Sequence, residues 1–125
     1  MTDAKTLLIV DDSRVSRMMI RGLVTSKRPA WTVVEAVSGD DALQVVGRQQ
    51  VDFCTMDINM PGLLGTDAAE QIMQAHPAVR LALFSANIQE SQKARASQLG
   101  VKFVAKPVNE KSVLDAVGFF EGASL

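Results

Sequence analysis

Short apolar runs and amphipathic segments alternate along the whole chain of 125 residues. The apolar runs predict strands at residues 6–10, 31–37, 51–56, 80–84 and 101–105. The segments between and after them carry apolar residues at helical spacing and predict helices at about 14–26, 39–49, 65–75, 88–98 and 109–120. Most of the strand runs are almost continuously apolar, which is typical of parallel strands covered by helices on both faces.

Five strand–helix units with short connections predict an α/β fold with right-handed crossovers. The solution that fits is the flavodoxin-like (βα)5 fold, a doubly wound parallel sheet with strand order 2-1-3-4-5. The length is that of one domain, so residues 1–125 are expected to form a single folded unit.

The helical spacing also predicts which faces are buried. In the first helix, Val15, Met18, Met19 and Leu23 are expected to face the sheet. At the end of the chain, Phe119-Phe120 can hardly both face inward from one helix, so one of them is expected to contact a partner or to cover the edge of the core.

The fourth predicted helix differs from the others because it lacks large apolar residues between Ile88 and Leu99. A helix with so little to bury is weakly held by its neighbours. We therefore expect this helix to be able to move.

Polar side chains follow the predicted strands where each strand ends. Asp11 and Asp12 close the first run, Asp57 the third, Ser85 the fourth and Lys106 the fifth. Ligands of open parallel sheets bind at the carboxyl ends of the strands. If these strands are neighbours, the five side chains meet in one small pocket.

Three carboxylates in one pocket repel each other, by about 4 kcal/mol for a pair 4 Å apart at an effective dielectric constant of 20. Either one carboxylate is protonated, or positive charge lies among them, for which Lys106 and a divalent cation are the candidates. An all-oxygen site with few protein ligands favours Mg²⁺ over Ca²⁺. A cation and a lysine beside an aspartate favour phosphoryl transfer, with Asp57 as nucleophile and Ser85 as hydrogen-bond donor. Read singly, the aspartates could instead be turn and helix-capping residues.

Short motifs carry these side chains at the strand ends: Leu8-Ile9-Val10-Asp11-Asp12-Ser13, Met56-Asp57-Ile58-Asn59-Met60-Pro61-Gly62, Ser85-Ala86 and Phe103-Val104-Ala105-Lys106-Pro107. In this order and spacing they resemble the receiver domain of two-component response regulators, most closely the single-domain chemotaxis (CheY-like) type. The resemblance covers essentially the whole chain.

The resemblance implies a phosphorylation site and a metal site. Asp57 would accept a phosphoryl group from a histidine kinase or phosphotransferase, and Lys106 would pair with that group. Mg²⁺ would be held directly by Asp12, Asp57 and the backbone carbonyl of Asn59, with Asp11 acting largely through water. The chain would catalyse its own phosphorylation and dephosphorylation and would not otherwise be an enzyme.

The resemblance also implies a switch. Ser85 would move toward the phosphoryl group, and Phe103 would swing inward when Ser85 moves. The Lys106-Pro107 bond is expected to be cis. Partners would bind the surface formed by the fourth helix, the fifth strand and the fifth helix, and the protein would be a monomer or a dimer driven by phosphorylation.

The composition argues against several other classes of function. The net charge of −1 and scattered basic residues give no support for a nucleic-acid or membrane partner. Cys54 is the single cysteine and lies in an apolar run, which favours a buried structural thiol. With no run long enough for a bilayer and no signal peptide, we expect a cytoplasmic protein.

Other functions remain alternatives. The same scaffold could serve as a phosphorylation-independent interaction module, or the chain could be a receiver domain cut from a longer regulator or hybrid kinase. A hydrolase of the haloacid-dehalogenase type is disfavoured because its second aspartate, two residues after the nucleophile, is here Asn59. The chain starts with Met and stops just after the last predicted helix, so output through protein contacts is expected.

Overall fold

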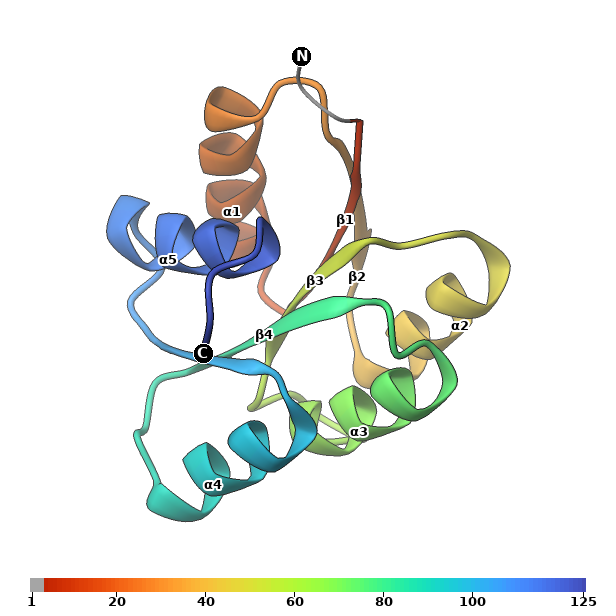
Figure 1. Ribbon diagram of the computed structural model, residues 1–125, viewed down its shortest axis with the longest axis vertical. Helices are drawn as coiled ribbons and strands as arrows, with labels where there is room; N and C mark the ends of the chain where they lie inside the picture. Colours follow the sequence, from red (N-terminus) through yellow and green to blue (C-terminus); the bar gives the residue numbers. More distant parts are fainter. Residues whose placement is uncertain (1–3) are drawn as a thin grey trace.

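Strands and helices alternate through residues 4–125, the part of the chain that the computed structural model describes (Figure 1). The strands are β1 (Thr6–Val10), β2 (Thr32–Ala36), β3 (Phe53–Asp57), β4 (Arg80–Ser85) and β5 (Lys102–Ala105). The helices are α1 (Arg14–Lys27), α2 (Gly39–Arg48), α3 (Gly65–Ala75), α4 (Glu90–Leu99) and α5 (Glu110–Phe120). Every predicted element is present.

The strands form one parallel sheet in the order β2-β1-β3-β4-β5, which confirms the flavodoxin-like prediction. The register aligns the strand ends: Val10 of β1 pairs with Ala36 of β2 and Met56 of β3. On the other side of β3, Asp57 pairs with Phe84 of β4. The residues that follow β1, β3 and β4 therefore leave the sheet at one edge.

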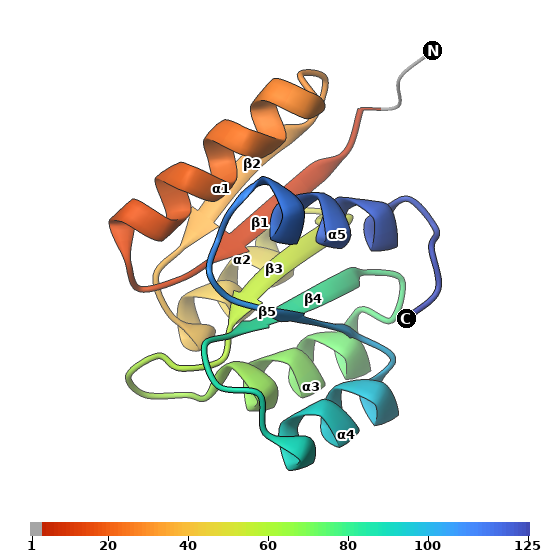
Figure 2. The same ribbon diagram turned by 90° about the vertical axis from the view of Figure 1, so that its left-hand side faces the viewer.

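Helices cover both faces of the sheet. Helices α1 and α5 lie on one face, and α2, α3 and α4 lie on the other (Figures 1 and 2). Each interface has its own apolar core, since alternate residues of a strand point to opposite faces. Leu7, Ile9 and Phe53 pack under α1 and α5, whereas Leu8 and Cys54 pack under the other three helices.

The predicted buried face of α1 is wrong for three of its four residues. Val15, Met18 and Met19 are 66%, 60% and 45% exposed, and the helix instead buries Ile20 and Val24. Ile20 and Val24 lie on one face of α1, and Arg17, three residues before Ile20, lies on that face and bonds to groups at the carboxyl edge of the sheet, as described below. This side of the helix therefore faces the sheet, and the other apolar stripe is turned to solvent.

The expectation that Phe119 and Phe120 can hardly both face inward from one helix is also wrong. Phe119 and Phe120 are only 4% and 3% exposed. Phe120 stacks on Phe53 at 5.0 Å between ring centroids, while the guanidinium of Arg80 covers Phe119 at 4.1 Å from its ring centroid. Arg80 also donates to the carbonyl oxygens of Phe119 and Ala123, so a side chain from β4 covers the second ring.

Helix α4 is held differently from its neighbours. Its one buried residue is Ala96, in keeping with the lack of large apolar side chains in the sequence. Arg95 instead ties α4 to α3, with its Nη2 atom 2.8 Å from Asp67 and 3.0 Å from Glu70. Exposed ion pairs of this kind each contribute little to stability, about 0–1 kcal/mol. With one buried alanine and exposed ion pairs, α4 is held to the rest of the domain by little apolar contact.

Two expectations from composition can be compared with the structure. Cys54 is fully buried in β3, and burial raises the pKa of its thiol, so it is an unreactive core side chain. Within residues 4–125, no helix combines the length and apolar character needed to span a bilayer.

Candidate functional site

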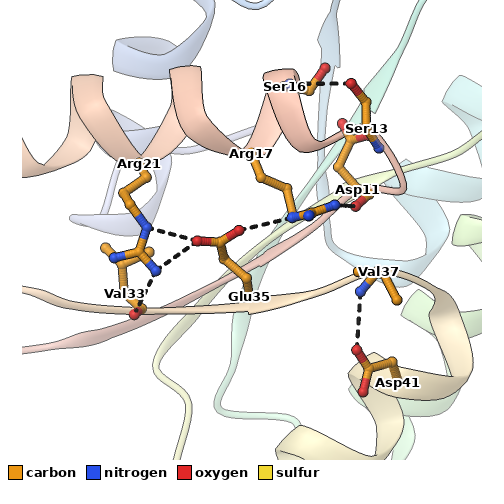
Figure 3. Close-up of polar contacts among 9 residues, drawn as sticks. All are labelled: Asp11, Ser13, Ser16, Arg17, Arg21, Val33, Glu35, Val37 and Asp41. Carbon is orange, nitrogen blue, oxygen red and sulfur yellow. Dashed lines mark hydrogen bonds and ion pairs between the residues drawn. The ribbon is translucent and has the colours of Figure 1, made fainter.

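Asp11, the first residue after β1, is held by three separate hydrogen bonds. Its carbonyl oxygen accepts from Arg17 Nη1 at 2.8 Å (Figure 3). Its backbone amide donates to the carbonyl oxygen of Ala36 at 3.2 Å. Its Oδ1 atom accepts from the amide of Ser13 at 2.8 Å. Ser13 in turn caps α1 by accepting from the amide of Ser16.

Asp57 is the last residue of β3 and is buried. Its Oδ1 atom lies 3.2 Å from Lys106 Nζ and accepts from the amide of Asn59 at 3.3 Å. The start of α3 packs directly on its backbone: the amide of Gly65 donates to Ile58, and a Cβ atom on Gly65 would lie 2.2 Å from the carbonyl oxygen of Asp57. A glycine is therefore required at position 65.

The two loops bring three carboxylates together. Asp11, Asp12 and Asp57 each offer one carboxylate oxygen, and these three oxygens lie within 4.8 Å of one another. Asp11 and Asp57 are buried, whereas Asp12 is exposed, so the cluster opens to solvent. Burial raises the pKa of Asp11, and the nearby charge of Asp57 adds to that effect.

This donor set fits Mg²⁺. The ligand atoms are all carboxylate oxygens, and the exposed side of the cluster leaves room for the water molecules that Mg²⁺ retains. The ammonium of Lys106 faces three carboxylates, which leaves an excess of negative charge that a divalent cation would offset. The predicted convergence of these acidic residues and Lys106 is therefore present.

Ser85 ends β4 on the neighbouring strand and is fully buried. Its hydroxyl donates to the carbonyl oxygen of Asn87 at 2.7 Å and accepts from the Asn87 amide at 3.2 Å. The backbone amide of Lys106 donates to the carbonyl oxygen of Ser85 at 2.8 Å, which joins the ends of β4 and β5. The Lys106–Pro107 peptide bond is cis, as expected.

Phe103 lies in β5 opposite Leu83 of β4. Its side chain is half-buried and packs against the apolar core under α2, α3 and α4. It therefore has one side on the core and one on the surface formed by α4, β5 and α5.

The sequence did not indicate two features of the site. One is the close packing of Gly65 on Asp57, although the sequence predicts a helix that starts at about residue 65. The other is Arg17, which bridges Asp11 and Glu35. No local sequence pattern indicates this bridge, because it depends on the register of β1 with β2, which places Glu35 opposite Ile9.

Comparisons with known proteins agree on the family. A family model described as the response regulator receiver domain matches residues 7–118. The chemotaxis protein CheY of Thermotoga maritima is 34% identical over 114 residues, covering 90% of this chain and 94% of the relative. The chemotaxis protein CheY of Bacillus subtilis is 36% identical over 115 residues, covering 91% and 95%.

Two further comparisons concern a longer protein and a solved structure. A protein-glutamate methylesterase/protein-glutamine glutaminase of Syntrophomonas wolfei is 37% identical over 112 residues, which are 87% of this chain but 32% of that protein. The CheX-CheY-BeF3-Mg complex from Borrelia burgdorferi contains a similar chain, with a TM-score of 0.86, 25% identity and coverage of 95% of this chain and 90% of that one.

Proposed function

Because the chain belongs to the response regulator receiver domain family and is CheY-like, we propose that it is a phosphorylation-dependent signalling switch whose phosphoacceptor is Asp57. The observation that carries the proposal is the surroundings of Asp57: a buried carboxylate 3.2 Å from the ammonium of Lys106 and within 4.8 Å of two further carboxylates. A solved relative combines CheY with BeF3 and Mg, as named for the Borrelia complex.

The proposed chemistry is transfer of one phosphoryl group. A carboxylate oxygen of Asp57 attacks phosphorus, the bond from phosphorus to the donor nitrogen or oxygen breaks, and its electron pair leaves with the donor. Lys106 would pair with oxygen atoms of the arriving group, because its ammonium already lies beside Asp57. The protein would catalyse only its own phosphorylation and dephosphorylation.

Asp11, Asp12, Asp57 and the backbone carbonyl of Asn59 would hold Mg²⁺ in this proposal. When bound, Mg²⁺ supplies positive charge that offsets the repulsion between the carboxylates and the phosphoryl oxygens. The excess of carboxylates over the ammonium of Lys106 supports this assignment.

Switching would follow from the hydroxyl of Ser85. It donates to Asn87, so a new hydrogen bond to a phosphoryl oxygen on Asp57 requires that bond to break. The connection from β4 to α4 would then rearrange, and α4 has little apolar surface to hold it. Phe103, half-buried on the adjoining strand, would move inward with Ser85.

Partner surfaces are part of the same proposal. The exposed stripe of Val15, Met18 and Met19 begins just after the acidic loop, at helical spacing on α1. A histidine kinase or phosphotransferase packing on this stripe would bring its phosphohistidine next to Asp57. Output partners would bind the α4–β5–α5 surface, with the protein acting as a monomer or as a dimer formed on phosphorylation.

Two settings are compatible with this role. The CheY relatives match over nearly their whole length, whereas the methylesterase relative contains the matching segment as about a third of its chain. A free-standing switch and a receiver domain of a longer regulator would share the same acceptor chemistry. A cytoplasmic location is also proposed, and the free buried thiol of Cys54 is compatible with a reducing compartment.

The test is the intact mass of the protein after incubation with acetyl phosphate. The wild type should gain one phosphoryl group with Mg²⁺ and none with excess chelator, and Asp57→Asn should gain none under either condition. Uptake by Asp57→Asn equal to that of the wild type would refute the acceptor assignment. No uptake by the wild type with any small donor would favour a phosphorylation-independent interaction module on the same scaffold.

A further inference from the structure

Arg17 of α1 connects the acidic cluster to β2. Its Nη1 atom donates to the carbonyl oxygen of Asp11 at 2.8 Å, and its Nε atom donates to Glu35 Oε1 at 2.8 Å (Figure 3). The side chain is only 13% exposed, so the guanidinium is held between the helix and the sheet. Arg17 thus contacts the backbone of Asp11, a predicted metal-site residue, but is not itself a predicted metal ligand.

Glu35 is held from a second side by Arg21. The Nε and Nη2 atoms of Arg21 lie 2.8 Å and 2.7 Å from Glu35 Oε2. Burial opposes ionisation of Glu35, but the hydrogen bonds from Arg21 and Arg17 outweigh that effect and lower its pKa. Glu35 is therefore ionised at neutral pH and provides a fixed anchor for Arg17.

The result is that β2 holds both backbone polar groups of Asp11. The amide donates directly to Ala36, and the carbonyl oxygen is held through Arg17 and Glu35, the residue just before Ala36. One carboxylate oxygen, Oδ1, accepts from Ser13. These contacts fix where the side chain of Asp11 enters the cluster with Asp12 and Asp57.

We propose that Arg17 is a positioning residue for the metal site: by holding the carbonyl of Asp11 against Glu35, it fixes the acidic cluster in the geometry that binds Mg²⁺. This role rests on the proposed function. Positive charge near the cluster would by itself weaken cation binding, so charge and positioning have opposite effects on the affinity. The two effects are therefore separable by experiment.

The separating variant is Arg17→Lys, which keeps the charge but loses the planar fork that reaches two acceptors at once. Arg21→Lys is the matched control, because it disturbs the same Glu35 carboxylate but has no bond to Asp11. Mg²⁺ binding to the full chain is measured by calorimetry without a phosphoryl donor. We expect about a tenfold weaker affinity for Arg17→Lys, the lower end of the range for lost support around metal ligands. Arg21→Lys should stay within about twofold of the wild type.

A second measurement separates positioning from general damage to the fold. The rate of phosphorylation by acetyl phosphate is followed as Mg²⁺ is raised. For Arg17→Lys, the Mg²⁺ concentration at half-maximal rate should rise by the same factor as the dissociation constant, while the maximal rate is retained. A lower maximal rate at an unchanged half-saturating concentration would overturn the proposal.

The remaining outcomes are distinct. Wild-type affinity in Arg17→Lys would overturn the role of Arg17 and leave the proposed function intact. Equal weakening in Arg17→Lys and Arg21→Lys would also overturn it, because the effect would then come from Glu35 in general. A wild-type protein that neither binds Mg²⁺ nor takes up phosphoryl groups would overturn the proposed function and this role together.

Discussion

The hydroxyl of Ser85 donates a hydrogen bond to the carbonyl oxygen of Asn87 at 2.7 Å, two residues further along the chain. The hydroxyl oxygen of Ser85 in turn accepts from the Asn87 amide at 3.2 Å. Ser85 is fully buried, so its hydroxyl gives up this partner only if another acceptor replaces it. A phosphoryl oxygen on Asp57 would be such an acceptor, which links modification of β3 to the conformation of the loop before α4.

The first prediction concerns this link. Ser85→Ala should still take up a phosphoryl group on Asp57, since Lys106 and the acidic cluster are intact. It should not transmit the change, because no hydroxyl exchanges partners. Hydrogen exchange of the amides between residues 86 and 90 should respond to phosphorylation in the wild type and not in Ser85→Ala.

Ser85→Thr is the control, because it retains a hydroxyl on the same carbon atom. It should respond as the wild type does. An equal response of the loop in Ser85→Ala would show that the signal leaves Asp57 by another route.

The second prediction concerns Gly65. Its replacement by alanine would place Cβ 2.2 Å from the carbonyl oxygen of Asp57, so α3 or the end of β3 must move. We expect Gly65→Ala to lower the free energy of unfolding by about 1–3 kcal/mol, the usual cost of overpacking. Phosphoryl uptake from acetyl phosphate should slow, because the displaced backbone carries the acceptor.

Gly118→Ala in α5 is the matched control for Gly65→Ala. A Cβ atom at position 118 meets nothing within 4 Å, so this variant should gain about 0.5–1 kcal/mol from the better helix propensity of alanine. Both values come from urea unfolding. A neutral effect of Gly65→Ala would mean that the start of α3 is not packed on Asp57 in solution.

The third prediction follows from the raised pKa of Asp11, which burial causes and the charge of Asp57 reinforces. A carboxyl whose pKa is raised by folding stabilises the fold below its unfolded pKa, and this contribution is lost as the pH rises through the folded value. Ionised Asp11 is thus unfavourable in the metal-free protein at neutral pH. Asp11→Asn should therefore be more stable than the wild type at pH 7 in chelator.

The pH dependence tests the sign. The advantage of Asp11→Asn should shrink as the pH falls through the folded pKa of Asp11 toward 3.8, the ordinary pKa of an aspartate side chain. Mg²⁺ should stabilise the wild type more than the variant at pH 7, because the variant lacks one charge. Thermal unfolding with chelator and with Mg²⁺ measures both differences. A less stable Asp11→Asn at pH 7 in chelator would contradict the electrostatic account.

The fourth prediction concerns the exposed stripe on α1. The double variant Val15→Ser with Met18→Ser should change the free energy of unfolding by no more than about 0.5 kcal/mol, because both side chains face solvent. Transfer from a histidine kinase that phosphorylates the wild type should slow about tenfold, the equivalent of about 1.4 kcal/mol. Uptake from acetyl phosphate should be unchanged.

Val37→Ser is the control for the stripe, since Val37 is also exposed but lies outside α1. It should receive phosphoryl groups from the kinase at the wild-type rate. Equal slowing with kinase and with acetyl phosphate would mean that the α1 variant damages the site and not a docking surface.

The fold and the convergence of Asp11, Asp57 and Lys106 were predictable from the sequence. Continuously apolar runs predict parallel strands that helices cover on both faces. Parallel strands bring their carboxyl ends to the same edge of the sheet, where ligands bind. The elements lie within two residues of their predicted bounds. The rotation of α1 was not predictable, because the helix has two apolar stripes and the one that contains Ile20 and Val24 packs on the sheet.

Contacts between distant segments explain the wrong prediction for Phe119 and the two features of the site that the sequence did not indicate. Phe119 is covered by Arg80, a residue 39 positions earlier whose side chain reaches across from β4. Arg17 and Gly65 act on the site through backbone groups of Asp11 and Asp57. Such contacts depend on the final packing, and local sequence patterns do not record them.

The most direct test of the central claim is to identify the modified residue. Protein treated with acetyl phosphate and Mg²⁺ is reduced with borohydride, which converts an aspartyl phosphate to homoserine, and the peptides are sequenced by mass spectrometry. We expect homoserine at position 57 and intact aspartate at positions 11 and 12. Homoserine at position 11 or 12, with Asp57 unchanged, would contradict it.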